Sequence, residues 1–295
     1  SRGVWKMDNA LIVEARKKYH RTLIDKCVLT LSAEGVASNA DSSSAPSKSI
    51  AEIIARKMGA ATGTKLKGQT AGKLFEQITM QFVADTFPHL QHLRPGNWTI
   101  LNLGNQNAIK TSDFAQYEHL AYLAALMEKN KQLATMLGND YMVAPDVVVY
   151  RDLYEDEQIN QGQIFINDDI CTMANLRKKN GGKPILHASI SAKWTMRSDR
   201  AQNSRTEALN LIRNRKGNLP HIVVVTGEPL PSRLASLALG TGDLDCVYHF
   251  ALYELIDAVR EYGSQGREDI VETLENLVEG KRLKDISDLP LDLSV

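Results

Sequence analysis

Short runs rich in Val and Ile alternate with amphipathic helical patterns, and this alternation restricts the possible folds more than any other feature of the chain. The strand-like runs lie near residues 98–103, 145–151, 185–194, 220–226 and 244–249. Apolar residues at helical spacing cover 8–31, 49–59, 70–86, 112–137, 198–215, 231–239 and 250–279. Strands that alternate with helices predict an α/β fold, with a mixed or parallel central sheet flanked by helices.

The length and composition are those of a globular protein. Of 295 residues, 43% are hydrophobic and 24% are charged, which excludes general disorder and a fibrous chain. One domain of ~200–250 residues with added elements fits this length, so we expect a single domain. Its expected parts are an N-terminal helical extension, a core and a C-terminal helical region, at residues 1–34, 35–254 and 255–295.

Neither a membrane span nor a secretion signal is expected. The longest apolar stretches, near 147–149 and 222–225, are far shorter than the roughly 18 residues that a membrane helix needs. The opening SRGVWKMDNA has no apolar signal core. Cys27, Cys171 and Cys246 are odd in number and far apart, which fits a reducing compartment and neither a zinc site nor a disulfide framework. We therefore expect a cytoplasmic protein.

Charge is segregated along the chain although its sum is zero, with 35 Lys and Arg against 35 Asp and Glu. A zero sum argues against a surface that binds nucleic acid or anionic membranes through overall positive charge. However, residues 193–216 hold seven basic and two acidic residues, whereas 151–169 hold one basic and six acidic, and 250–295 hold five basic and eleven acidic. The basic segment could form a local face for a polyanion. The alternative is a solvated helix face, which is the more common role of such a segment.

A Ser-rich stretch, VASNADSSSAPSKS at residues 36–49, has the composition of a loop. From composition, the preferred interpretation is a disordered connector. The alternative is a binding loop, because long loops within compact domains often carry functional residues.

Common nucleotide-binding and hydrolase motifs do not fit. Gly63, Gly68 and Gly72 lack the spacing of a phosphate-binding loop, and no hydroxyl residue follows Lys73. His187 and Ser191 share a strand face but are separated by roughly 13 Å at ~3.3 Å per residue, too far for proton transfer. We therefore expect His187 to be a hydrogen-bonded core residue rather than the base of a serine hydrolase.

One set of polar residues has the chemistry of metal-dependent phosphodiester hydrolysis. Asp146 opens the strand-like run APDVVVYR, Ser191 and Lys193 share one face of ILHASISAKWT, and Glu207 follows on a helix. Asp146 and Glu207 would supply carboxylates to Mg²⁺, which generates hydroxide at neutral pH. Lys193 would orient the attacking water and stabilise charge on phosphorus. Ser191 would orient Lys193 or a metal-bound water.

On spacing alone this pattern is weak. The alternative is that Asp146 caps a strand end and that Lys193 and Glu207 form a surface ion pair, worth under ~1 kcal/mol. Without further information, that structural interpretation is the stronger one.

Longer blocks of sequence surround the pattern. They are SISAKWTMRSDRAQNSRTEALNLIRNRKGNLPHIVVVT, PSRLASLALGTGDLDCVYHFALYEL and GKRLKDISDLPLDLSV, preceded by GVASNAD, GQTAGKLFE, LQHLRPGNW and DYMVAPDVVV. In these blocks the chain closely resembles the type II restriction endonucleases that recognise CCGG, most nearly those that cut GCCGGC. The resemblance covers nearly everything from Gly35 onward, while 1–34 and 260–279 match less clearly.

The resemblance implies a PD-(D/E)xK nuclease core in the variant where Ser occupies the usual position of an acid and a following helix supplies the displaced carboxylate. The implied active-site residues are Asp146, Ser191, Lys193 and Glu207, with Glu76 as an auxiliary acid. The implied metal ligands are Asp146, Glu207 and the backbone carbonyl of Ala192, for two Mg²⁺ ions per site. A relative carries Cys in place of Ala192, a difference that a main-chain contact tolerates.

The RSDR segment has the residue types that read G and C. Arg197, Asp199 and Arg200 lie where a strand passes into a helix. An Arg fork fits guanine O6 and N7, and an Asp accepts from cytosine N4 in the major groove. The alternative role is capping and solubility, but the resemblance implies that this segment reads CCGG.

Three further residues match positions that contact DNA in the relatives. Arg233 and Asp41 correspond to readers of the outer G·C pair, and Gln69 to a minor-groove contact. If Asp41 has this role, the Ser-rich stretch is a recognition arm and not a connector.

The expected activity is Mg²⁺-dependent cleavage of double-stranded DNA at 5′-GCCGGC, after the first G, leaving a 5′-CCGG overhang. A palindrome requires two-fold protein symmetry, and the resemblance implies a homotetramer of two dimers. It also implies a cognate DNA methyltransferase in the same bacterial system, without a stable complex. The alternatives are a CCGG-binding protein that does not cut, disfavoured by the intact acids and lysine, and a structure-specific repair nuclease, disfavoured by RSDR.

Overall fold

The structure, a computed structural model, describes residues 9–103, 109–137, 145–240 and 242–295, without the side chains of 137 and 198–200. It divides into two compact units. The first unit contains Ser1–Arg94, Ser191–Arg205 and Ile222–Val295, and the second contains Pro95–Ile190 and Thr206–His221.

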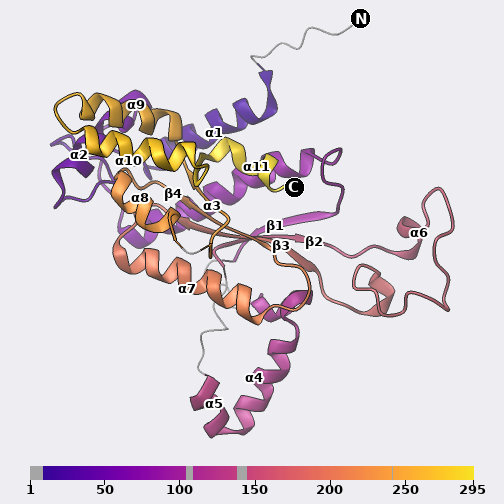
Figure 1. Cartoon of the computed structure of the whole chain (residues 1–295). Coiled ribbons are helices and arrows are strands. Elements are labelled where there is room, and N and C mark those ends of the chain that lie inside the picture. The colour runs from indigo at the N-terminus through magenta and orange to yellow at the C-terminus, as the bar shows by residue number, and fades with distance from the viewer. Residues whose placement is uncertain (1–8, 104–108, 138–144, 241) are drawn as a thin grey trace, which may run out of the picture. The chain divides into compact units, whose positions relative to one another are not determined.

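The described residues contain six strands in a mixed sheet that follows chain order (Figure 1). The strands are β1 (Trp98–Asn102), β2 (Val147–Arg151), β3 (Ile185–Lys193), β4 (His221–Thr226), β5 (Cys246–His249) and β6 (Leu283–Asp285). β1, β2 and β3 pair antiparallel, whereas β4, β5 and β6 pair parallel. The predicted mixed α/β fold with flanking helices is thus confirmed.

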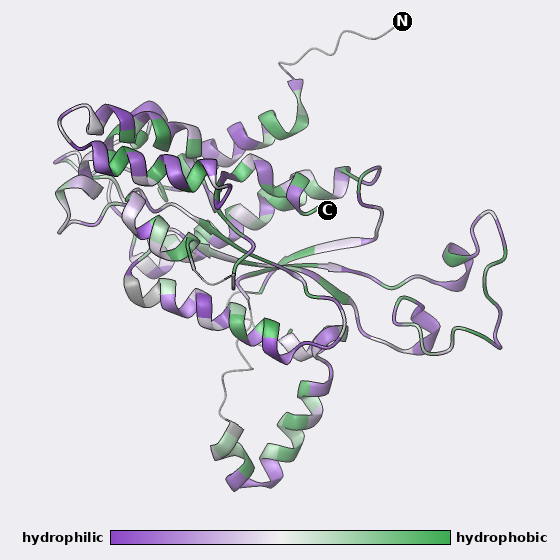
Figure 2. Cartoon of the chain, viewed as in Figure 1, coloured by the Kyte–Doolittle hydropathy of each residue, from purple (hydrophilic) through white to green (hydrophobic). Residues whose placement is uncertain are grey.

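Helices of the first unit cover its parallel strands. They are α1 (Leu11–Asp25), α2 (Ala45–Lys57), α3 (Gly68–Thr86), α8 (Pro231–Ala238), α9 (Leu252–Gly263), α10 (Glu268–Glu279) and α11 (Leu289–Asp292), with the start of α7 (Ser198–Asn214). α8 packs on β5, and α9 and α10 pack on β6. β4 and β5 are almost wholly buried. The apolar run Ile222–Val225 within β4 is typical of a strand covered on both faces, and Figure 2 shows the central strands largely in the hydrophobic colour.

The second unit adds the short helices α4 (His119–Lys129), α5 (Lys131–Leu137) and α6 (Asp156–Ile159). In Figure 1 the segment between β2 and β3, which includes α6, extends away from the strands of this unit. The β2–β3 register shifts between Val149 and Tyr150, so that the pairing skips His187. His187 is 8% exposed and its ring lies 4.6 Å from that of Trp98 and 4.9 Å from that of His221. It is therefore a core residue, as expected.

A buried side-chain amide completes the backbone hydrogen bonds at the start of β3. The amide nitrogen of Gln116 donates to the carbonyl oxygen of Leu186 at 2.7 Å, and the Leu186 N–H donates to Oε1 of Gln116 at 3.0 Å. Gln116 is 4% exposed. Its side chain therefore takes the place of a neighbouring strand at this position.

Three predicted helices are shorter than their patterns indicate. The first ends at Asp25, because Cys27 has a positive φ of 58° and turns the chain. The pattern over 112–137 is interrupted at Asn130, whose side-chain oxygen accepts from the first N–H groups of α5. The pattern over 250–279 divides into α9 and α10 at a turn where Gly266 has φ 86°.

The interpretation of residues 36–49 as a disordered connector is wrong. Ser38 and Asn39 are buried, and Ser44 caps the N-terminus of α2 by accepting from the N–H of Ser47. The second half of the stretch is thus the first turn of a helix. Among the described residues, no helix is long and apolar enough to cross a membrane.

Candidate functional site

The end of β3 is held firmly in the first unit. The N–H of Gly227 donates to the carbonyl oxygen of Lys193 at 3.2 Å. The ring of the next residue, Trp194, packs between Phe75 and Phe250, with centroids 5.2 and 5.0 Å away. Lys193 is half-buried, whereas Trp194 is 3% exposed. The buried tryptophan therefore fixes the backbone that carries the predicted catalytic lysine.

Ser191, predicted to replace the usual acid, is buried beside α7. Its hydroxyl oxygen lies 3.3 Å from that of Ser204, and both residues are less than 10% exposed. Ala192 follows with its side chain 1% exposed. Glu76, the predicted auxiliary acid, is half-buried on α3, directly after the core residue Phe75.

The two predicted metal-binding carboxylates belong to the second unit. Asp146 is half-buried just before β2, and its carbonyl oxygen accepts from the N–H of Leu103 at 2.9 Å. Glu207 is half-buried on α7. Within the part of the chain that the structure describes, no three His, Cys, Asp or Glu residues gather as a metal-binding group. A ligand set of two carboxylates and a main-chain carbonyl does not require such a group.

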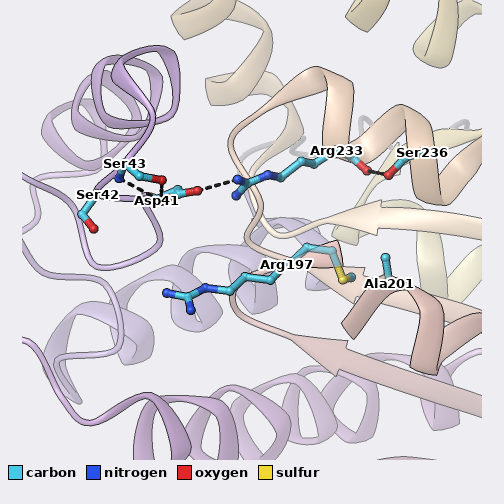
Figure 3. Close-up of a pocket in the computed structure, with 8 residues that line it drawn as sticks. Asp41, Ser42, Ser43, Arg197, Ala201, Arg233 and Ser236 are labelled. Atoms are coloured by element: carbon cyan, nitrogen blue, oxygen red, sulfur yellow. Dashed lines mark hydrogen bonds and ion pairs between the residues drawn. The ribbon is translucent and has the colours of Figure 1, made fainter. Parts of the chain in front are cut away.

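Two predicted DNA-reading arginines line one open pocket of about 480 Å³. Arg197 follows β3, and Arg233 lies on α8. Figure 3 shows both side chains extending in the same direction, toward the segment that carries Asp41. The pocket is lined by Asp41, Ser42, Ser43, Met196, Arg197, Ala201, Arg233 and Ser236. Segments from three distant parts of the sequence thus contribute to one polar surface.

Asp41 and Arg233 form an ion pair in this pocket, between Oδ2 and Nη2. The other carboxylate oxygen of Asp41 accepts from the hydroxyl and the N–H of Ser43, at 2.7 and 2.9 Å. The hydrogen bonds from Ser43, together with the guanidinium of Arg233, hold the pKa of Asp41 well below its usual value. Asp41 is therefore an ionised acceptor at neutral pH, on the stretch that composition assigned to a connector.

A second acid beside Arg233 was not predicted from the sequence. Glu228 follows β4 and is 1% exposed, and its carboxylate lies 3.9 Å from Nη1 of Arg233. Burial raises the pKa of Glu228 to about 7. A single acid in the segment TGEPL carries no recognisable signal, because the feature that distinguishes it is its burial.

The comparison with known proteins agrees with this arrangement. A family model described as "NgoMIV restriction enzyme" matches residues 19–295. The chain belongs to the NgoMIV restriction enzyme family. The type II restriction enzyme NgoMIV of Neisseria gonorrhoeae is 50% identical over 288 residues, which cover 97% of this chain and 100% of the relative. The predicted restriction-endonuclease-like fold is consistent with this membership, and the predicted class, a site-specific deoxyribonuclease of a restriction-modification system, is confirmed.

As a member of the NgoMIV restriction enzyme family, the chain acts on DNA and is expected to use a divalent metal ion. The other predicted DNA-reading residues lie on helices or directly before one. Gln69 is exposed at the start of α3, and Arg197 is exposed just before α7. Asp199 and Arg200 are in the first turn of α7, but their side chains lie outside the described part of the structure.

Proposed function

We propose that this enzyme cuts double-stranded DNA at palindromic 5′-GCCGGC, after the first G, and leaves a 5′-CCGG overhang. The observation that carries this proposal is the pocket in which Arg197, Arg233 and Asp41 meet. Arginine forks donate to guanine O6 and N7, and a carboxylate accepts from cytosine N4. A surface with two arginines and one ionised aspartate thus suits G and C on both strands.

The proposed recognition residues fall into two groups, one for the central CCGG and one for the outer G·C pair. Arg197, Asp199 and Arg200 read the central CCGG from the start of α7. Arg233 and Asp41 read the outer G·C pair, and Gln69 contacts the minor groove.

The proposed active site consists of Asp146, Ser191, Lys193 and Glu207, with Glu76 as an auxiliary acid. Strand geometry supports the pairing of two of these residues. Ser191 and Lys193 both lie on β3, two positions apart. Side chains alternate along a strand, so Lys193 shares the face of Ser191.

The chemistry is a metal-assisted displacement at phosphorus. Asp146, Glu207 and the carbonyl of Ala192 would hold two Mg²⁺ ions, whose hard oxygen preference fits this set. When bound, the metal neutralises charge on the phosphate and acidifies water. Lys193 orients the attacking water and stabilises the nonbridging oxygen as a point cation. Ser191, buried beside Ser204, fixes the strand end that carries Lys193.

We infer one restriction-endonuclease domain over residues 1–295, with an N-terminal extension at 1–34, a core at 35–254 and a C-terminal helical region at 255–295. Three of the four boundaries between the two compact units fall inside elements: after Ile190 within β3, after Arg205 within α7 and after His221 within β4. A strand and a helix that each contribute to both units support one domain rather than two.

The proposed assembly is a homotetramer of two dimers. A palindromic site requires two-fold symmetry, which accounts for the dimer, and the tetramer rests on the family resemblance. The long connection between β2 and β3 offers a surface for contact between subunits, because large apolar side chains on it are exposed. They are Ile164, Phe165, Ile170 and Met173, with exposed fractions of 81, 58, 51 and 90%. The buried side chain of Arg177 stabilises this connection by donating hydrogen bonds to Asp156 at 2.6 and 2.7 Å. The proposed location is the bacterial cytoplasm, where a cognate DNA methyltransferase of the same system would protect the host sites without a stable complex.

Digestion of DNA that carries each CCGG-centred hexamer tests the proposal. Mg²⁺-dependent cleavage confined to GCCGGC, with ends mapped after the first G, is expected. Cleavage that ignores sequence, or preference for a branched over a linear CCGG substrate, would overturn it in favour of a repair nuclease. Specific binding without any Mg²⁺-dependent product would identify a DNA-binding protein that does not cut.

A further inference from the structure

Glu228 connects the two segments that carry the arginines of the pocket. One carboxylate oxygen accepts from the N–H of Met196 at 3.2 Å, directly before Arg197. The other accepts from the N–H of Leu230 at 3.0 Å, where α8 begins. At 1% exposure, Glu228 has little access to water, so these contacts are its main source of stabilisation. A single carboxylate thus holds the backbone on both sides of the pocket.

The same carboxylate faces the guanidinium of Arg233. Arg233 lies between Asp41, which contacts Nη2, and Glu228, whose Oε2 is 3.9 Å from Nη1. Asp41 is on a segment 192 positions earlier and is 16% exposed, whereas the Glu228 side chain is 2% exposed. The buried acid is therefore the less mobile of the two partners, and the one that can fix the direction of the fork.

We propose that Glu228 is a positioning residue for base recognition: it holds Arg233 and the Met196–Arg197 backbone in one geometry, so that discrimination at the outer base pair depends on its carboxylate. This inference rests on the proposed role of Arg233 as the reader of that pair. Glu228 itself touches no base. Loss of the negative charge of Glu228 leaves the Arg233 guanidinium held by Asp41. The guanidinium can then reorient.

The charged and titratable groups that face Glu228 indicate the pH range in which the charge of Glu228 affects base recognition. They are Asp41, Arg233, His249 on β5, whose Nε2 lies 3.0 Å from the Glu228 carbonyl oxygen, and Lys65 and Arg197 around the adjoining pocket. Burial lowers the pKa of His249 to about 4, and the pKa of Asp41 lies well below its usual value. Burial raises the pKa of Glu228 to about 7. Among these groups, Glu228 is therefore the one whose shifted pKa lies between about pH 6 and 8.

The decisive measurement is the ratio of affinities for duplexes that contain GCCGGC and ACCGGT, with Ca²⁺ in place of Mg²⁺ so that binding is read without cutting. Glu228→Gln is expected to lower this ratio by about tenfold or more, the usual effect of losing one well-formed arginine–guanine contact. Glu254→Gln, a half-buried acid paired with Arg16 in the same unit, is the matched control and is expected to keep the wild-type ratio. An unchanged ratio in Glu228→Gln overturns the inference.

The wild-type protein gives an independent test if Glu228→Gln does not fold. Its ratio is expected to be lower at pH 6 than at pH 8, because Glu228 is largely neutral at the lower pH. A ratio that is equal at both values, with the protein folded at both, overturns the inference. A wild-type protein with no preference for any CCGG hexamer refutes the proposed function instead, so the two failures are distinguishable.

Discussion

The hydroxyl oxygens of Ser191 and Ser204 lie 3.3 Å apart in the interior of the first unit, with 7 and 2% of the two residues exposed. This hydrogen bond joins the end of β3 to the second turn of α7. The strand carries the proposed catalytic lysine, and the helix begins with the proposed CCGG readers. The alignment of chemistry and recognition therefore depends partly on two neutral hydroxyl groups.

Ser204→Ala is expected to lower the free energy of unfolding by about 1 kcal/mol, because it leaves a buried hydroxyl without this partner. Urea unfolding measures the change. Ser264→Ala removes an exposed hydroxyl that contacts the Glu261 carbonyl and is expected to change stability by less than about 0.5 kcal/mol. Equal losses in both variants would show that burial of this pair has no special effect.

Lys193→Ala is expected to reduce the cleavage rate by about 10²-fold or more, the usual effect of removing a group that stabilises developing charge. Binding of GCCGGC in Ca²⁺ is expected to persist. Lys17→Ala, which breaks an exposed pair with Glu14, is the control and should cut normally. Turnover retained by the Lys193 variant would remove this residue from the mechanism.

Gly227→Ala is expected to destabilise the protein by roughly 1–3 kcal/mol through overpacking. A Cβ at this position would lie 2.5 Å from Cε3 of Trp194 and 2.8 Å from its backbone oxygen. Gly72→Ala on α3 meets no heavy atom within 4 Å, and should stabilise the helix by about 0.5–1 kcal/mol. Thermal unfolding of the two variants should therefore shift in opposite directions; a shift in the same direction would contradict the contact.

Arg16→Met is expected to cost about 3–5 kcal/mol at neutral pH, because Asp285 is 0% exposed and would lose a partner 2.9 Å away. Burial alone would raise the pKa of Asp285, but hydrogen bonds from Arg16 and its positive charge outweigh burial and lower it. A lowered folded-state pKa gives stability that is present above the unfolded pKa, near 4, and is lost as the pH falls. The difference between wild type and variant should thus shrink in acid; a constant difference would refute the assignment.

Glu228→Gln should change stability with the opposite pH dependence. Burial raises the pKa of Glu228 from 4.5 to about 7, so the stability contributed by its neutral form is complete below about pH 4.5 and is lost as the pH rises through 7. Relative to the variant, wild type is expected to lose about 3 kcal/mol between pH 4.5 and 8. Urea unfolding at several pH values measures this without DNA, and a flat difference would argue that Glu228 is not desolvated.

The periodicity of the sequence predicted the sheet better than the ends of the helices. All five predicted strands are present, because runs such as IVVVT fit no other buried element of that length. β6 was missed because Leu283–Asp285 is short and contains Lys284; its pairing with β5 depends on tertiary contacts. The helix breaks at Asn130 and Gly266 were not predicted, because apolar residues on both sides of each break continue the helical spacing.

The recognition pocket was predictable in its residues but not in its geometry. Arg233 and Asp41 were named through family resemblance, yet their ion pair across 192 positions requires the fold. Glu228 could not be found at all, since an acid after a strand is usually a solvated loop charge. Its burial by the segment around Met196 and by the start of α8 is a property of the packed structure.

The amide of Gln116 has a consequence for solubility. Strands that expose unpaired N–H and C=O groups can recruit strands from other chains and seed aggregates. By occupying both backbone groups of Leu186, Gln116 shields this position from such recruitment, using a side chain that cannot itself extend a sheet. One buried side chain thereby protects the start of β3, the longest strand among the described residues, from pairing with a second chain.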